Sequence, residues 1–300
     1  LTKLIPEEKV IKLMKDAATA SYAKKGDDVV KMNHDAIDAG ATAYIKVDVP
    51  ESWKNCPDDN LTEKIGEGRP EVIDFVKNVQ AKVNAQQGNT IPVSVVKTYE
   101  TGNTPSGTAA YEKRGVATDV PVWDADKCIG CNICSYVCPH ACIRPVAMTE
   151  EEAAAAPEGM QMKEMLGMPQ YKFAITVSAF DCTGCGSCVN VCPAKEKAIS
   201  MQSFEANEDE QKYFDYAVKL PEKQDVIDKF KVNTVKGSQF KQPLLEFSGA
   251  CGGCGETPYA KLLTQLFGDR MYIANATGCS SIWGNSSPST PYTVNAQGQD

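Results

Sequence analysis

The sequence predicts an α/β protein that is interrupted by a cysteine-rich α+β domain. Apolar residues recur at helical spacing near both ends of the 300-residue chain, and short alternating runs typical of strands follow them. Most of the 13 cysteines gather between these regions. The expected domains are the C-terminal part of an α/β domain over 1–66, a small α/β domain over 67–107, the cysteine-rich domain over 108–225 and the start of another α/β domain over 226–300.

The first domain should contain two helices and a strand. Apolar residues from Val10 to Ala18 repeat at helical spacing, and Gly26 can end that helix. A second helix would close at Gly40, and residues 44–49 alternate like a strand. None of these residues suggests catalysis, so we interpret the region as scaffold.

Later segments repeat this mixture of helix and strand. The apolar stripe of a helix covers residues 73–83, residues 91–95 alternate like a strand, and the turn-rich residues 101–107 mark a boundary. Near the end, a helix should start at Pro258, and residues 271–274 should form the next strand. The buried face of that helix should consist of four apolar residues, Leu262, Leu263, Leu266 and Phe267.

Composition excludes several kinds of partner. The formal net charge of −8 does not suit binding to a phosphate backbone, so nucleic acid is not expected. No apolar run approaches the roughly 18 residues of a membrane span, and the first residues show no signal-peptide pattern. We therefore expect a cytoplasmic protein that does not bind membranes. Because the chain starts at Leu1 and ends in a polar loop at Asp300, we also expect a piece of a longer polypeptide.

Two cysteine runs, at residues 128–139 and 182–193, follow the pattern C-x₂-C-x₂-C-x₃-C-P without a mismatch. This pattern is typical of two [4Fe–4S] clusters, because one tight loop supplies three ligands and its fourth cysteine ligates the other cluster. The predicted ligands of the first cluster are Cys128, Cys131, Cys134 and Cys192. Those of the second cluster are Cys182, Cys185, Cys188 and Cys138. The pattern therefore predicts a ferredoxin-like domain that transfers single electrons.

A pair of zinc sites is the alternative for these cysteines. Zinc favours two C-x-x-C knuckles that together supply four ligands, whereas each run here offers four cysteines closed by a proline. Gly130, Gly184 and Gly186 suit loops whose amides approach cluster sulfides and tune the reduction potential. The runs therefore favour iron–sulfur clusters.

A third group contains Cys251, Cys254 and, further along, Cys279. Three cysteines make an incomplete site. The residues alone leave open a third [4Fe–4S] cluster with a ligand beyond this chain, a zinc site and a redox-active thiol pair. The glycines of CGGCGE indicate close approach of the backbone to a bound group.

Two cysteines and both histidines are left over. Cys142 exceeds the ligand count of its run, and Cys56 stands in a polar loop, so we expect neither to be a ligand. His34 and His140 have no partner for a nucleophile triad or a zinc-bound water, and we expect structural roles for both. Because no side chain is recognisably catalytic, a cofactor would have to carry any chemistry.

The cysteine-rich domain, the motif CGGCGETPY and residues 268–284 (GDRMYIANATGCSSIWG) together resemble pyruvate:ferredoxin (flavodoxin) oxidoreductases. The order of parts is similar to a central fragment of the long single-chain form, and the resemblance covers most of the chain. It is most specific over 128–138, 182–192 and 251–284. Residues 226–300 would then open a thiamine-diphosphate-binding domain.

The resemblance implies three [4Fe–4S] clusters, thiamine diphosphate with Mg²⁺, and coenzyme A as co-substrate. Enzymes of this family decarboxylate pyruvate oxidatively and pass electrons to ferredoxin or flavodoxin, and a homodimer is expected. Cys251, Cys254 and Cys279 would hold the third cluster, with a fourth ligand outside this chain. Glu256 and Cys279 would contact thiamine diphosphate, and Asn33 would lie near coenzyme A.

The chain also departs from the family pattern. The pyruvate-binding domain, the magnesium-binding diphosphate segment and the fourth ligand of the third cluster are missing, so this chain alone should not turn over pyruvate. Cys142 stands where a small apolar residue is expected. The alternatives are a non-enzymatic two-cluster subunit of another redox complex and a structural zinc protein.

Overall fold

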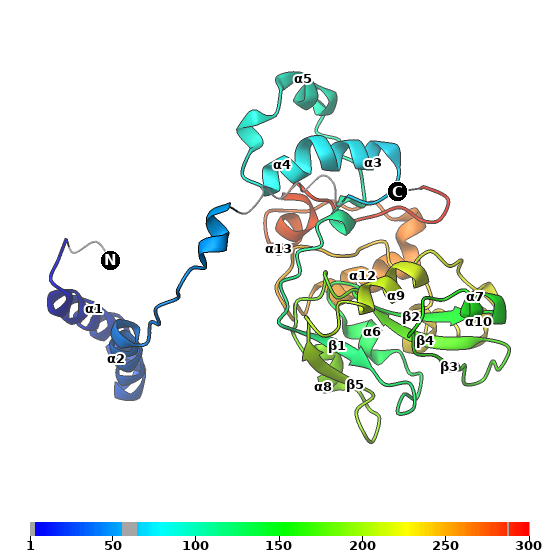
Figure 1. The fold of residues 1–300 in the computed structure, drawn as a ribbon, viewed down its shortest axis with the longest axis horizontal. Coiled ribbons are helices and arrows are strands. Elements are labelled where there is room, and N and C mark those ends of the chain that lie inside the picture. The colour runs from blue at the N-terminus through cyan, green and yellow to red at the C-terminus, as the bar shows by residue number, and fades with distance from the viewer. Residues whose placement is uncertain (1–3, 56–64, 287, 300) are drawn as a thin grey trace. The chain divides into compact units, whose positions relative to one another are not determined.

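The computed structural model describes residues 4–55, 65–286 and 288–299 of the chain, which divides into two compact units. The first unit comprises residues 1–59 and the second residues 60–300. Helices and strands are both present, which confirms the mixed α/β class (Figure 1). Within the described ranges, no helix combines the length and the apolarity needed to cross a membrane.

The first unit is built from two helices, α1 (Glu7–Tyr22) and α2 (Asp27–Thr42), which the sequence predicted (Figure 1, blue). The 3₁₀ turn η1 (Ala23–Lys25) and Gly26, at φ 102°, reverse the chain between them. Lys15 Nζ lies 2.7 Å from Asp38 Oδ2, and His34 Nε2 donates to Lys15 O at 3.1 Å. These polar contacts join the two helices.

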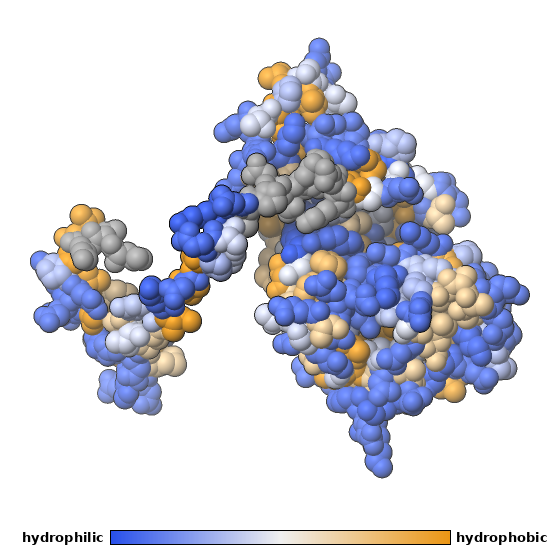
Figure 2. Space-filling view, in the orientation of Figure 1, coloured by the Kyte–Doolittle hydropathy of each residue, from blue (hydrophilic) through white to orange (hydrophobic). Residues whose placement is uncertain are grey.

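The strand predicted over residues 44–49 is wrong. These residues have no regular structure, and the chain continues into the 3₁₀ turn η2 (Glu51–Asn55). A strand must bond to a neighbouring strand, and no described residue of this unit supplies one. Tyr44 and Ile45 are consequently 80% and 83% exposed. No residue within 4–55 is buried, and Figure 2 shows apolar side chains on the surface of this unit.

The second unit begins with the helix predicted over residues 73–83. Three helical segments follow one another without a break: α3 (Pro70–Phe75), the π-helical η3 (Val76–Gln80) and α4 (Ala81–Asn84). Pro70 occupies the first turn, where its missing N–H costs nothing. Val72, Phe75 and Val76 are buried along the apolar stripe.

The strand predicted over residues 91–95 is also wrong. After the 3₁₀ turn η4 (Gly88–Thr90), this segment forms the helical turns α5 (Val93–Val96) and η5 (Lys97–Tyr99). Pro92 precedes α5 with φ −62°, and a proline there favours a helix start because it removes a donor that a strand would need. Val93 is 83% exposed, so the alternation of valines does not reflect a buried face.

The cysteine-rich domain contains two small antiparallel sheets. Strand β1 (Asp119–Trp123) pairs with β5 (Ile199–Ser203), with Val120 opposite Gln202. The second sheet has the order β2–β4–β3, formed by β2 (Ile143–Met148), β4 (Lys172–Val177) and β3 (Lys163–Glu164). Each half of the domain therefore reads strand, cysteine loop, short helix, strand, and each strand pairs with one from the other half.

The short helices of the two halves are α6 (Ile133–Val137) and α8 (Ser187–Val191), which lie against each other. Strands β2 and β4 are buried along most of their length, and Met148, Phe173 and Val177 lie in the core between them and the cysteines. The segment between β2 and β3 forms the short helix α7 (Glu150–Ala154). The core thus forms around the cysteine loops.

The remaining helices cover this core. They are the 3₁₀ turn η6 (Thr108–Tyr111), α9 (Glu210–Ala217), α10 (Gln224–Phe230), α11 (Val235–Ser238), α12 (Thr257–Phe267), the 3₁₀ turn η7 (Gly268–Arg270), α13 (Cys279–Ser281) and the π-helical η8 (Ile282–Ser286). Residues 271–274, predicted as a strand, have no regular structure. Tyr272 is fully exposed, and no described strand lies beside it to accept its hydrogen bonds.

Helix α12 starts at Thr257 with a proline in its first turn, as predicted, but its buried face is not the predicted one. Lys261, Thr264 and Gln265 are buried, whereas Leu263 and Phe267 are 47% and 44% exposed. The polar face turns inward because neighbouring segments satisfy it. Thr264 Oγ1, for example, accepts the Leu244 N–H at 3.1 Å.

Candidate iron–sulfur centres

The first cysteine loop and one cysteine of the second run line a common cavity. Its sulfur-bearing residues are Cys128, Cys131, Cys134 and Cys192. Gly130, at φ 65°, and Asn132, at φ 62°, curl the loop around the cavity. The Gly130 N–H donates to Cys128 Sγ at 3.3 Å, which aims a backbone amide at the sulfur side of the loop.

The second loop mirrors this arrangement. A second cavity is lined by Cys182, Cys185, Cys188 and Cys138, together with Cys142 and His140. Gly184 and Gly186, at φ 67° and 71°, turn this loop, and the Gly184 N–H donates to Cys182 Sγ at 3.4 Å. The structure therefore brings together both four-cysteine sets that the sequence grouped.

Prolines redirect the fourth cysteine of each run. Cys138 and Cys192 follow the last residues of α6 and α8 and adopt extended backbone angles, with ψ 116° and 118°. The residue before a proline is disfavoured in the helical region, so Pro139 and Pro193 end the helices at these cysteines. Each run thereby turns its last cysteine toward the cavity of the other loop.

The buried thiols need a compensating positive charge before they can ionise. Burial, and then the neighbouring Cys138 and Cys182 sulfurs, raise the pKa of Cys188 to about 12, and burial likewise raises the pKa of Cys182 to about 12. Burial also raises the pKa of Cys134, with Cys128 adding to it. Metal binding requires thiolates, so iron at these cavities would displace the protons and supply the missing charge. The donor set fits a cluster.

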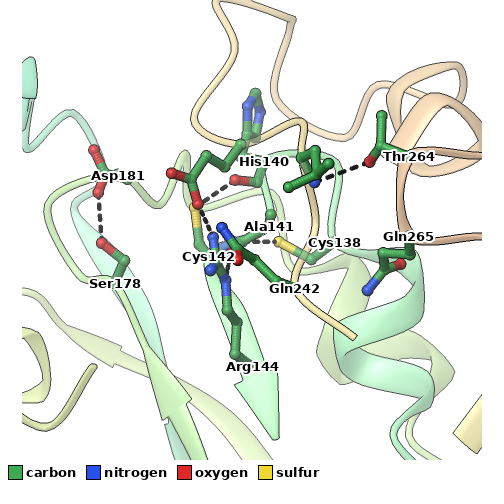
Figure 3. Close-up of polar contacts among 12 residues, drawn as sticks. Cys138, His140, Ala141, Cys142, Arg144, Ser178, Asp181, Gln242, Thr264 and Gln265 are labelled. Carbon is green, nitrogen blue, oxygen red and sulfur yellow. Dashed lines mark hydrogen bonds and ion pairs between the residues drawn. The ribbon is translucent and has the colours of Figure 1, made fainter. Parts of the chain in front are cut away.

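Cys138 has different surroundings. It accepts the Cys142 N–H at 3.3 Å, and Figure 3 shows both cysteines flanking Ala141, whose φ is 55°. A side-chain hydrogen bond from Cys142 holds the pKa of Cys138 well below its usual value despite its burial, and the Lys261 ammonium acts in the same direction. Burial and the Cys138 sulfur raise the pKa of Cys142, which therefore stays a neutral thiol.

The third cysteine group begins on a loop that contacts the second run. A Cβ placed on Gly253, at φ 74°, would lie 3.6 Å from Cys185 Cβ, and one placed on Gly252 would lie 3.5 Å from Thr183 Oγ1. Cys254 is partly buried, but hydrogen bonds from the Thr257 and Glu256 backbone outweigh that burial and lower its pKa. Cys251 is exposed. The glycines between Cys251 and Cys254 therefore lie against the second cysteine run.

Cys279 and Glu256 stand at the ends of two helices. Cys279 is exposed at the start of α13, and within the described ranges it does not converge with Cys251 and Cys254 as around a metal ion. Glu256 occupies the N-cap of α12 without a capping hydrogen bond, and its Oε2 instead accepts Trp283 Nε1–H at 3.3 Å. Among the described residues, no three His, Cys, Asp or Glu side chains converge as around a single metal ion, and none of the described cysteines is in a disulfide.

Two family models match parts of the chain. A 4Fe-4S dicluster domain matches residues 127–196, and a domain of unknown function, EKR, matches residues 58–117. Among curated relatives, the pyruvate-flavodoxin oxidoreductase of Enterobacter agglomerans is 50% identical over 299 residues, which is 100% of this chain and 25% of that protein. The pyruvate:ferredoxin oxidoreductase of Moorella thermoacetica is 48% identical over 99% of this chain and 25% of its own length. The pyruvate dehydrogenase [NADP(+)] of Cryptosporidium parvum is 46% identical over 99% of this chain and 16% of its own length.

The chain corresponds to a segment of the pyruvate:ferredoxin (flavodoxin) oxidoreductases. The resemblance predicted from the cysteine runs and the CGGCGETPY motif is thereby confirmed. The chain spans about a quarter of the length of the first two relatives named, so the activity of a whole oxidoreductase does not follow from it directly.

The remaining predicted residues lie in different parts of the structure. Asn33 stands in α2 of the first unit, where its amide donates to Val29 O at 2.8 Å. Cys56 lies outside the described residues. His140 is buried beside the second cavity, where its Nδ1–H donates to Ser248 O at 3.0 Å and its Nε2 has no partner among the described residues.

Sequence reasoning missed the lysines around the cysteine loops. Lys163 Nζ donates to Cys128 O at 2.8 Å, and Lys197 Nζ donates to Cys192 O at 2.7 Å. Lys261 Nζ, from α12, donates to Cys138 O at 3.2 Å. Lys163 and Lys261 are distant in sequence from the cysteines whose carbonyls they bind, so only the tertiary fold brings them there, whereas Lys197 follows Cys192 by five residues.

Proposed function

We propose that this chain carries the electron relay of a pyruvate:ferredoxin (flavodoxin) oxidoreductase. The observation that carries the proposal is the pair of cavities, each lined by three cysteines of one run and the fourth of the other. Each would hold a [4Fe–4S] cluster, which accepts and releases one electron at a time. The identity over 99–100% of this chain to enzymes named for pyruvate and for flavodoxin or ferredoxin supports the same conclusion.

The relay would run from the third cysteine group to the second cavity and then to the first. The contact of Gly253 with Cys185 supports this order, because the loop of Cys251 and Cys254 lies directly on the second run. The proposed third cluster takes Cys251, Cys254 and Cys279, with a fourth ligand from elsewhere in the polypeptide. Thiamine diphosphate, contacted by Glu256 and Cys279, would supply the decarboxylation chemistry when bound.

The wider assignments belong to the same proposal. They are the domain boundaries 1–66, 67–107, 108–225 and 226–300, a Mg²⁺ ion with the thiamine diphosphate, coenzyme A near Asn33, ferredoxin or flavodoxin as acceptor, a homodimer and a cytoplasmic location. The sequence identity of 41–50% to pyruvate-flavodoxin and pyruvate:ferredoxin oxidoreductases supports pyruvate as the substrate and ferredoxin or flavodoxin as the electron acceptor. Reducing conditions in the cytoplasm suit thiolates that bind iron.

Iron and acid-labile sulfide measurements on the anaerobically purified long polypeptide test the proposal. Three cubanes require about twelve irons per polypeptide, since each contains four. About eight irons would favour a two-cluster electron carrier, and stoichiometric zinc without iron–sulfur absorption would overturn the cluster assignment. Cys131→Ser and Cys185→Ser should each perturb one of the two clusters in this segment. Pyruvate- and coenzyme-A-dependent reduction of flavodoxin then tests the activity itself.

A further inference from the structure

Lys261 is a lysine buried without a carboxylate partner in the described part of the chain. Only 2% of its surface is exposed, and it lies on the inward face of α12. Its ammonium donates to three backbone carbonyls at the end of α6: Ser135 O, Tyr136 O at 3.2 Å and Cys138 O at 3.2 Å. Arg144, a cation whose charge acts on Lys261, is already paired with Glu246.

Carbonyl dipoles alone compensate a buried ammonium poorly. The C-terminal end of a helix as short as α6 offers only a fraction of a negative charge, and desolvating an ion costs several kcal/mol. A full negative charge would be far more effective, and the cysteine ligands are its nearest source. Cys138 belongs to the second four-cysteine set and Cys134, on the same helix, to the first. Of the three carbonyls that bind Lys261, one is that of Cys138 itself.

The first four-cysteine set has several cations instead of one. Lys163 and Lys197 bind the carbonyls of Cys128 and Cys192. Lys236 lies near the first loop, since a Cβ placed on Gly130 would be 3.9 Å from its Nζ. Its main chain is tied to the loop as well, because Asn132 Nδ2 donates to Lys236 O at 3.0 Å. Lys236 is partly exposed, so water screens its charge more than that of Lys261.

This inference rests on the proposed clusters. We propose that Lys261 is the cation that serves one cluster and raises its reduction potential. That cluster is the one held by Cys138, Cys182, Cys185 and Cys188. One-electron reduction adds one negative charge to a cluster, and a fixed ammonium nearby stabilises the reduced form. The interaction is strong because Lys261 is sealed from solvent. Lys261 would position the Cys138 main chain through its hydrogen bond to the Cys138 carbonyl, and its positive charge would tune the potential of the cluster.

Matched substitutions separate the two clusters. Lys261→Gln removes a charge beside the second cluster, and Lys236→Gln removes one beside the first. Both variants and the parent polypeptide, purified anaerobically, are titrated with dithionite and followed by electron paramagnetic resonance. Cys131→Ser and Cys185→Ser assign each reduced signal to its cluster. Lys261→Gln should move the midpoint potential of the second cluster to a more negative value and should change the midpoint potential of the first cluster less. Lys236→Gln should show the opposite preference with a smaller shift.

Three further variants guard the interpretation. Lys261→Met keeps a side chain of similar size without the charge, and it replaces the Gln variant in the titration if that variant does not fold. Lys261→Arg keeps the charge and should leave the potential close to that of the parent. Lys223→Gln, which removes a lysine that is 13% exposed and paired with Glu152, should shift neither cluster.

The outcomes distinguish this inference from the proposed function. A parent polypeptide without iron and sulfide would overturn the proposed function, and with it the cluster that Lys261 serves. Fully loaded neutral variants with an unchanged second-cluster potential would overturn the role of Lys261 alone. Equal shifts of both clusters in Lys261→Gln would also overturn it, because the proposal assigns the residue to one cluster.

Discussion

Cys142 lies among the four cysteines of the second cavity without being one of the predicted ligands. It is 1% exposed, and its thiol contacts His140 O at 3.6 Å. Its link to Cys138 Sγ runs partly through the main-chain N–H at 3.3 Å, which survives any side-chain change. The fifth cysteine therefore supports a ligand without having to bind iron.

Cys142→Ala should keep both clusters, whereas Cys138→Ala should lose the second. Removing a small buried side chain costs on the order of 1 kcal/mol, which lowers stability without emptying the site. Cys138→Ala removes a thiolate that the cluster needs. Iron per chain and visible absorption, measured on both variants after identical anaerobic loading, check the expectation. Loss of about four irons in Cys142→Ala would show that Cys142 is a ligand after all.

Glu210 should make the stability of the cysteine-rich region depend on pH. It lies in the first turn of α9, where the helix dipole favours a carboxylate. Burial, and then the Asp209 carboxylate, nevertheless raise the pKa of Glu210 to about 7. Because the folded pKa exceeds the unfolded value, protonated Glu210 stabilises the fold at low pH. That contribution is lost as the pH rises through about 7.

Glu210→Gln should therefore stabilise the protein most at about pH 8.5, above the folded pKa, and less at about pH 5.5, where the native carboxyl is mostly protonated but the unfolded one is already largely ionised. After allowance for solvent screening, a gain of about 1 kcal/mol is expected at the higher pH, or about 2–4 °C in the thermal midpoint. Anaerobic thermal unfolding of the cluster-loaded protein measures it. The exposed Glu208→Gln serves as the control for a simple change of net charge. A gain of equal size at both pH values would contradict the titration.

At the scale of single residues, the sequence was informative where chemistry depends on local spacing. The cysteine sets follow from C-x₂-C-x₂-C-x₃-C-P because one loop has to wrap one cluster. Lys261 escaped prediction because its role depends on burial beside a segment distant in sequence. The Lys261 ammonium, for instance, binds a carbonyl more than 120 residues away.

Among the elements, helices were predicted better than strands for a physical reason. A helix satisfies its own hydrogen bonds, so the apolar stripe over 73–83 and the proline in the first turn of α12 are enough to predict a helix at each place. A strand needs a partner, and alternation alone cannot tell whether one exists. Residues 44–49, 91–95 and 271–274 alternate but have no partner strand among the described residues. The buried face of α12 was predicted wrongly because its polar residues find hydrogen-bond partners in other segments.

Helix α7 carries a capping box that joins the segment between the two cysteine runs to the helices beside it. Thr149 Oγ1 accepts the Glu152 N–H at 3.2 Å, and Glu152 Oε2 accepts the Thr149 N–H at 2.8 Å. The other carboxylate oxygen of Glu152 lies 2.5 Å from Lys223 Nζ, and its carbonyl accepts the Tyr216 hydroxyl at 2.6 Å. The cap therefore orients contacts to α9 and to the residue before α10.

Thr149→Ala should cost about 1 kcal/mol, which is typical of a lost N-cap. The expected fall in the thermal midpoint is about 2–4 °C, with faster amide exchange in α7. Thr149→Ser keeps the hydroxyl and should stay within a few tenths of a kcal/mol of the parent. If both variants behaved alike, the loss would come from the methyl group rather than from the cap.

For the whole molecule, the crossing of the two runs connects local motifs to the fold. Strand β1 precedes the first cysteine run and pairs with β5, which follows the second run. Strand β2 follows the first run and pairs with β4, which precedes the second run. The sequence predicted a ferredoxin-like domain from the crossing, and the matching dicluster family model supports that coarse assignment. The sequence could not predict which segments cover the core, because helices α9 to α12 have no counterpart in the repeated pattern of the two halves.

Removing the iron should loosen the second unit and leave the first unchanged. Cys138 and Cys188 belong to the buried core, so each empty site would leave desolvated thiols without the charge that holds them together. The described cysteines all lie in the second unit, whereas α1 and α2 are joined by their own contacts. Hydrogen exchange followed by mass spectrometry, before and after iron chelation, compares β1, β2, β4 and β5 with α1 and α2. The strands should exchange about tenfold faster or more, equivalent to about 1.4 kcal/mol or more. The helices of the first unit serve as the internal control. Unchanged protection of the strands would mean that packing alone holds the two runs together, and that the clusters add electron transfer without adding stability.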